Sequence, residues 1–282
     1  MRHAYTKSGD TLKYNGLPSI WNPAFMVRWA VDHRKAFKKT PPEADRYIAL
    51  QEARAEHVSG KKYPNYFASS NAHIRIANAH ERMGKTSEKE LERAKAARDI
   101  LYGLNKDCVV GEKLVLEIKK AEILLPSSTV DQKTAEGISL ILGKLTRRCM
   151  GEAEHLLSIG RLDWALEMIT RVAKIYKMAE RNLSSQTLEF QVGAIAINAL
   201  GFRLSKREGS ECDNEARRCA LELGLRHNRA QSDEKPLIAS ALRDFGLAVS
   251  FDGAQITKID NYAIPRIETE QNLVHLRLTR SE

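Results

Sequence analysis

Cysteine is scarce in this sequence: its 282 residues include four, namely Cys108, Cys149, Cys212 and Cys219. No two of them form a C-x-x-C pair, the spacing typical of zinc and redox sites. The chain is long enough to bury a substantial apolar core without cross-links or metals. We therefore expect reduced thiols, no metal ion and no cofactor.

Long apolar runs are missing as well. No stretch approaches the roughly 18 consecutive apolar residues that a membrane-spanning helix requires. The opening sequence, MRHAYTKSGDTLKYNG, lacks the apolar segment of a secretory signal. These absences predict an intracellular, cytoplasmic protein that does not contact a membrane.

Recognisable catalytic motifs are absent too. The triplet Gly84-Lys85-Thr86 imitates the end of a phosphate-binding loop, but Ala79 replaces the first required glycine and a helix precedes the triplet. His73 and His80 share a predicted helix without further metal ligands, which favours surface or capping histidines. No catalytic residue is predicted. An enzyme whose catalytic groups converge only in three dimensions stays open as an alternative.

Helical periodicity dominates the chain between residues 24 and 245. Helix starts are indicated by Thr40-Pro41-Pro42-Glu43, Ser87-x-x-Glu90 and Asp131, each with a capping side chain. After residue 246 the pattern changes to that of short strands, at 255–259 and 272–280. The fold class predicted is mainly α, an irregular stack of antiparallel helical hairpins with a small C-terminal β-hairpin. The predicted helices span about 24–39, 41–58, 65–83, 87–104, 109–125, 131–157, 162–176, 185–206, 213–223 and 234–245.

Three parts are predicted along the chain. Residues 1–24 carry turn formers and prolines and read as an extended N-terminal arm. Residues 25–246 form the helical domain. Residues 247–282 form a β-hairpin extension packed on that domain.

The clearest element is a pair of helices within 144–179, joined at Ser158-Ile159-Gly160-Arg161. The second helix of this pair carries apolar residues on two sides, which predicts cover on two sides. The element at 185–206 is apolar nearly all round and is expected at the centre of the fold.

This helical pair resembles one tetratricopeptide repeat, at about residues 145–178. Ala153, Leu156, Gly160, Ala165 and Ile169 fall at matching positions. Glu152, Cys149 and Lys177 depart from the pattern, and no regular array follows. The resemblance implies antiparallel helix pairs of the kind that bind peptides or protein partners; an ordinary helical hairpin is the competing interpretation.

Positive charge is concentrated near the start of the chain. The formal net charge is +9, and residues 1–67 contribute 12 Lys+Arg against 6 Asp+Glu together with 10 of the 18 aromatic residues. Aromatic rings interleaved with cations suit single-stranded nucleic acid, because bases stack on rings while cations follow the phosphates. The alternative is that these aromatics anchor the arm. The predicted nucleic-acid-binding residues are Arg28, Arg34, Lys35, Lys38, Lys39, Lys61, Lys62, Tyr63 and Tyr66.

A second basic zone follows the apolar 185–206 element. Its members are Arg203, Lys206, Arg207, Arg217 and Arg218. The order helix, helix and β-hairpin in this region also resembles a winged-helix module, with 234–245 as the recognition helix.

These features favour a non-enzymatic helical scaffold that associates with itself or a protein partner and engages nucleic acid, RNA or DNA, through a basic surface. A component of a nucleoprotein complex or a packaging protein fits this description. The alternative is a DNA-binding transcriptional regulator that uses the winged-helix-like segment.

Overall fold

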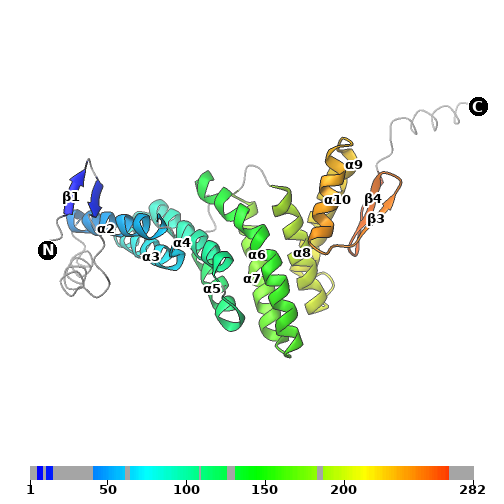
Figure 1. Ribbon diagram of the computed structural model, residues 1–282, viewed down its shortest axis with the longest axis horizontal. Coiled ribbons are helices and arrows are strands. Elements are labelled where there is room, and N and C mark those ends of the chain that lie inside the picture. Colours follow the sequence, from blue (N-terminus) through cyan, green and yellow to red (C-terminus); the bar gives the residue numbers. More distant parts are fainter. Residues whose placement is uncertain are drawn as a thin grey trace, which may run out of the picture. The chain divides into compact units, whose positions relative to one another are not determined.

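The computed structural model describes residues 5–8, 11–14, 41–60, 64–107, 109–125, 131–182 and 187–266 (Figure 1). Within these residues nine helices, α2 to α10, follow one another before a small antiparallel sheet. The predicted fold class is confirmed. The helix predicted at 24–39 lies outside the described residues.

The contacts of the chain divide it into two compact units. We call the described residues of Met1–Ile141 and Lys177–Ser184 the N-terminal unit, and those of Leu142–Tyr176 and Ser185–Glu282 the C-terminal unit. Two helices, α6 (Gln132–Ser158) and α7 (Leu162–Glu180), contribute residues to both. The sequence had predicted one helical domain over 25–246.

The N-terminal unit is a series of helices in which each packs on the next: α2 on α3, α3 on α4 and α4 on α5. Small side chains accompany the close approach of α3 and α4, because Ala72 on α3 and Ala96 on α4 are fully buried. Gly103 lies directly against the ring of Phe67. The bounds are α2 Pro41–Ser59, α3 Tyr66–Arg82, α4 Thr86–Lys106 and α5 Gly111–Leu124.

Two short strands, β1 (Tyr5–Ser8) and β2 (Thr11–Tyr14), form an antiparallel pair inside the segment predicted as the arm. Tyr5 is opposite Tyr14, and Ser8 is opposite Thr11. Strand β2 also contacts α2. The structure describes no other residue of 1–24.

The C-terminal unit is built around α8 (Leu188–Ser205), which is capped by the Thr187 side chain accepting from the Phe190 amide. Every residue from Val192 to Ala199 is buried, as expected for a helix that is apolar on all sides. On α7, the two apolar faces predicted from the sequence are covered, since Met168, Ile169 and Ile175 are all fully buried.

A buried tyrosine joins α6, α7 and α8. The Tyr176 hydroxyl lies 2.8 Å from Thr146 Oγ1, and its ring packs on Phe190 at a centroid distance of 4.8 Å. Burial raises the pKa of Tyr176, so the phenol remains neutral. Because the hydroxyl lies beside the Cα of Gly193, no side chain can replace this glycine without displacement.

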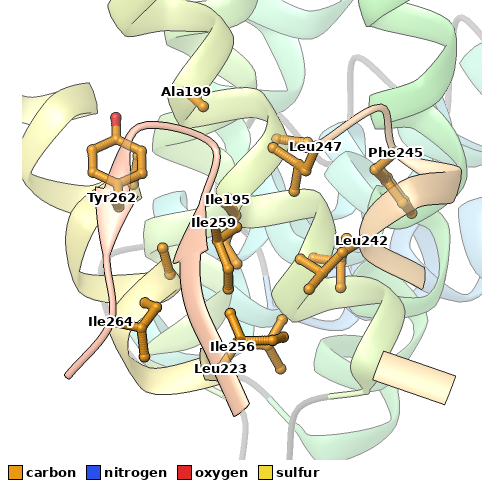
Figure 2. Packing of buried hydrophobic residues seen from close by; sticks show 14 of the residues in the cluster. Ile195, Ala199, Leu223, Leu242, Phe245, Leu247, Ile256, Ile259, Tyr262 and Ile264 are labelled. Carbon is orange, nitrogen blue, oxygen red and sulfur yellow. The ribbon is translucent and has the colours of Figure 1, made fainter. Parts of the chain in front are cut away.

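The last helices and the sheet share one apolar core with α8 (Figure 2). Helices α9 (Glu211–Arg229) and α10 (Glu234–Asp244) precede strands β3 (Val249–Asp252), β4 (Gln255–Ile259) and β5 (Tyr262–Ala263). The strands are antiparallel in the order β3-β4-β5. The predicted strand at 255–259 is thus β4, whose paired neighbours are β3 and β5, whereas the predicted strand at 272–280 lies outside the described residues.

Helix caps were predicted with mixed success. Asp131 does cap α6, because its carboxylate accepts from the Thr134 amide at 3.0 Å. The prediction for Ser87 was wrong: α4 begins at Thr86 after Lys85, and the Ser87 hydroxyl instead donates to Glu88. Helix α9 is longer than the predicted 213–223, since Ser210 caps it and its last turns bury polar side chains.

Replacement of Gly193 tests the close approach of α7 and α8. Gly193→Ala should destabilise the protein by about 1–3 kcal/mol, because the new methyl group overlaps the Tyr176 hydroxyl. Gly151→Ala on α6 is the matched control: a methyl group there meets nothing within 4 Å, so the change should stabilise by about 0.5–1 kcal/mol. Urea unfolding measures both, and equal effects of the two variants would contradict the packing argument.

Candidate nucleic-acid interface

The first predicted basic zone lies almost wholly outside the described residues. This applies to Arg28, Arg34, Lys35, Lys38, Lys39, Lys61, Lys62 and Tyr63. Tyr66, the remaining member, is the first residue of α3. The structure therefore leaves this zone as a prediction from the sequence.

Tyr66 already has an aromatic partner within the protein. Its ring stacks on Tyr102 of α4, with a centroid distance of 5.6 Å and an angle of 22° between the planes. Both rings are half-buried. The pair anchors the start of α3 to α4, and any base stacking here would add to an existing stack.

The second basic zone begins where α8 ends. Arg203 occupies the last turn, Lys206 adopts the left-handed conformation (φ 51°) that terminates the helix, and Arg207 follows. All three are exposed, and none has an ion pair among the described residues. Cations at this end also suit the helix dipole.

The other two members of the zone are paired with carboxylates on α9. Arg218 contacts Glu215 at 2.6 Å and Glu222 at 3.2 Å, while Arg217 lies 3.7 Å from Asp213. Residues 187–266 contain 11 Lys+Arg and 11 Asp+Glu. The zone is therefore locally basic only at Arg203, Lys206 and Arg207, within a neutral segment.

A buried polar cluster, missed from the sequence, connects α3 to α4; its members are Ser69, His73, Glu92, Lys95 and Asp99. The Ser69 hydroxyl donates to Asp99 at 2.5 Å, and His73 Nδ1 lies 2.7 Å from Glu92 Oε2. His73 Nε2 is 3.7 Å from Asp99. The prediction of a surface or capping role was wrong for His73, which is partly buried between two carboxylates.

The cluster does not have the geometry of a hydrolytic triad. In such a triad the histidine accepts the proton of the nucleophile, whereas here the Ser69 hydroxyl is directed at Asp99. Ser69, Glu92 and Asp99 are each less than a tenth exposed, so substrate has no access. The arrangement joins two helices through charge-assisted hydrogen bonds. A sequence signal did exist, since Glu92 and Asp99 are seven residues apart and lie on one face of α4 together with Ala96 and Gly103.

Burial and hydrogen bonding shift the pKa of Glu92 in opposite directions. Loss of water would by itself raise the pKa of this carboxyl group, but hydrogen bonds from His73 and Lys95 outweigh that effect and lower the pKa. Glu92 is therefore ionised in the folded protein, and its charge is balanced inside the cluster.

The structure also places other residues that could carry chemistry. Among the described residues, no group of His, Cys, Asp and Glu side chains is arranged to hold a metal ion. His155 is exposed. Burial raises the pKa of Cys149 to about 12, which makes this thiol unreactive. Gly84 terminates α3 at a φ of 71° and does not form a phosphate-binding loop.

The winged-helix-like segment does contain two helices followed by a β-hairpin. Helix α10, proposed as the recognition helix, has 11 residues and presents Leu237, Ser240 and Arg243 to solvent. The Arg243 guanidinium lies 5.9 Å from the centroid of Phe251 on β3. Leu237 is 63% exposed, which places an apolar side chain where a DNA reader would carry a polar one.

Comparison with known proteins gives one curated relative. The chain is similar to the arginine–tRNA ligase of Azotobacter vinelandii, with 23% identity over 238 residues that cover 78% of this chain and 40% of that protein. The chain thus spans less than half the length of this relative. No protein-family model matches the chain. No solved structure matches it.

None of the described helices is long and apolar enough to cross a membrane.

The buried polar cluster makes the protein sensitive to acid. Because the pKa of Glu92 is lower in the folded than in the unfolded chain, its contribution is complete above the unfolded value of about 4.3 and is lost as the pH falls towards the folded value. Glu92→Gln should cost about 1–3 kcal/mol near pH 7 and reduce the acid dependence of stability. Urea unfolding between about pH 7 and 3 measures both effects.

Glu81 is the matched control for Glu92. Each carboxylate lies 2.7 Å from a lysine, but Glu81 is exposed. Exposed ion pairs contribute little to stability, so Glu81→Gln should leave the unfolding curve unchanged. Similar losses in both variants would show that burial is not the cause.

Proposed function

We propose that this chain is a non-enzymatic helical scaffold that associates with itself or with a protein partner and engages nucleic acid through basic residues. Its charge distribution carries the proposal. Of the net +9, residues 1–67 contribute +6 and residues 187–266 contribute none. Nucleic-acid binding is therefore assigned first to the N-terminal zone, with the Arg203, Lys206 and Arg207 corner as an auxiliary contact.

Exposed apolar side chains support the association with protein. Leu157, Ile159 and Leu162 surround the turn between α6 and α7 and are 37%, 56% and 48% exposed. The tetratricopeptide-like pairing of these helices adds the second reason, because helix pairs of that kind present surfaces to partners. The proposed protein acts in the cytoplasm.

RNA is the first nucleic acid to test. The relative from Azotobacter vinelandii acts, as its name states, on tRNA, and stacked aromatics beside cations suit unpaired bases. An RNA-binding scaffold needs no catalytic group. The polar cluster of α3 and α4 is buried, and the proposal gives it a structural role only.

Titration with labelled tRNA, single-stranded DNA and double-stranded DNA at two salt concentrations tests the binding. We expect affinity to fall as salt rises, with a slope in log–log units of about 0.7 per phosphate neutralised on a single strand. Absence of binding to all three probes at low salt would reject the nucleic-acid part of the proposal.

Charge variants locate the interface. Replacement of Lys38, Lys39, Lys61 and Lys62 by Glu should abolish most of the binding. Replacement of Arg203, Lys206 and Arg207 by Gln should weaken it by about tenfold and lower the salt slope, since about one to three phosphate contacts are lost. Replacement of Lys106, Lys113 and Lys119, which are also exposed, by Gln is the control for net charge. If the Arg203, Lys206 and Arg207 variant and the Lys106, Lys113 and Lys119 variant lose the same affinity, the effect comes from overall charge.

A DNA-binding regulator is the second candidate function. The observation that favours it is the shared core of α9, α10 and the β-hairpin. A winged-helix reader would lose sequence preference when Arg243 is replaced by Ala, whereas the proposed scaffold would bind as before.

Self-association is tested by removal of the predicted arm. Deletion of residues 1–24 should reduce the oligomeric mass in light scattering if the arm joins copies of the chain. A second variant with Leu157, Ile159 and Leu162 replaced by Ser separates the two surfaces. An unchanged mass in both variants would remove self-association from the proposal.

A further inference from the structure

The end of α9 holds strand β4 through one buried side chain. The Asn228 amide nitrogen donates to the Ile256 carbonyl oxygen at 2.9 Å, and its oxygen accepts from the Ile256 amide at 2.7 Å. Strand β5 pairs with β4 at Lys258 and Ile259, and the Ile264 amide donates to the Thr257 carbonyl oxygen at 2.9 Å. Asn228 therefore takes the place of a neighbouring strand at Ile256, the next residue along that edge.

His227 fixes the orientation of this amide. Its Nδ1 lies 3.1 Å from Asn228 Oδ1, and because an amide oxygen only accepts, we assign the proton to Nδ1. The neutral and the protonated ring both make this hydrogen bond, so the two forms differ only at Nε2. His227 is 2% exposed, and its ring meets the edge of Phe251 on β3 at a centroid distance of 5.9 Å.

The charges around His227 disfavour a second proton. Burial lowers the pKa of His227, and the Lys235 ammonium group on α10 lowers it further, while the hydrogen bond to Asn228 acts in the opposite direction. Two nearby carboxylates, Glu234 and Asp252, are paired with Arg226 and Arg266. The other charged side chains on α9 and on the elements packed against it are Glu189, Arg203, Glu211, Asp213, Glu215, Arg217, Arg218, Glu222, Arg229, Arg243, Asp244 and Lys258.

We propose that His227 is a pH-sensitive lock on the C-terminal sheet. The ring holds Asn228 against β4 through Nδ1 and meets Phe251 on β3. A second proton, at Nε2, keeps the bond to Asn228 but places a cation near the Lys235 ammonium group on a side chain that is only 2% exposed, so the sheet is released from α9 in mild acid while α8 stays folded.

The direction of the pH dependence follows from the two states. When the sheet is released from α9, the pKa of His227 is near its ordinary value of about 6.5. When the sheet is packed on α9, this pKa is lower. The stability that the lock contributes is complete above about pH 6.5 and is lost as the pH falls below it. A fall from about pH 7.5 to 5.5 therefore raises the opening constant of the sheet by up to about tenfold.

Native-state hydrogen exchange on the full chain measures this opening at one amide. The Ile256 amide, hydrogen-bonded by Asn228, should show a rise of up to about tenfold after correction for intrinsic exchange rates. The Ile195 amide on α8 is the internal reference and should not follow it. Equal rises at both amides would mean global unfolding, and no rise at Ile256 would mean no lock; either result overturns the proposal.

Variants assign the effect to His227. His227→Gln, which cannot titrate, should remove the pH dependence at Ile256, while His155→Gln, an exposed control, should keep it. Persistence of the dependence in His227→Gln overturns the proposal. Because that variant may not fold, the wild-type His227 ring is also titrated by NMR: a midpoint below about 6.5 is expected, and one at or above this value would contradict the lock.

Discussion

The C-terminal unit depends on the need to cover α8 on every side. Val192 to Ala199 are all buried, and no face of this helix could be turned to water without loss of apolar burial. The unit satisfies the requirement with α7, whose Tyr176 ring packs on Phe190, and with α9, α10 and the sheet, which share one core with α8. Close approach needs glycine: Gly193 accommodates Tyr176, and Gly201 accommodates Cys212, whose sulfur would lie 2.9 Å from an added Cβ.

The N-terminal unit solves a different problem. Its helices carry many charges, and α4 places Glu92 and Asp99 on the face that it buries against α3. The cost of removing these carboxylates from water is offset by Ser69, His73 and Lys95. Ala96, which shares the face of Glu92 and Asp99, is fully buried and leaves room for such short contacts. The unit thus combines a thin apolar core with specific polar contacts, which fix the register of α3 on α4.

Periodic elements could be predicted from the sequence because their apolar residues repeat at helical spacing. The two faces of α7 and the Asp131 cap follow from local rules that the fold obeys. Strand β3 could not be found in this way, because three of its four residues are exposed and give no alternation. The end of α9 was missed because Arg226-His227-Asn228-Arg229 reads as a polar loop, whereas in the structure His227 and Asn228 are buried. The polar cluster could not be predicted, because the sequence alone does not show that α3 packs against α4. Of the predicted nucleic-acid site, Tyr66 and the second basic zone can be placed, and the rest is still a prediction from charge and composition.

Helices α6 and α7 each belong to both units, and this has a consequence for synthesis of the chain. The N-terminal unit takes its last segment, Lys177–Ser184, from sequence that follows Leu142–Tyr176 of the C-terminal unit. A growing chain on the ribosome therefore cannot complete the first unit until Leu142–Tyr176 of the second has also been made. Domains generally fold one after another as they emerge, but here the order of translation interleaves them. No single cleavage between residues 141 and 185 would separate the two units with both intact.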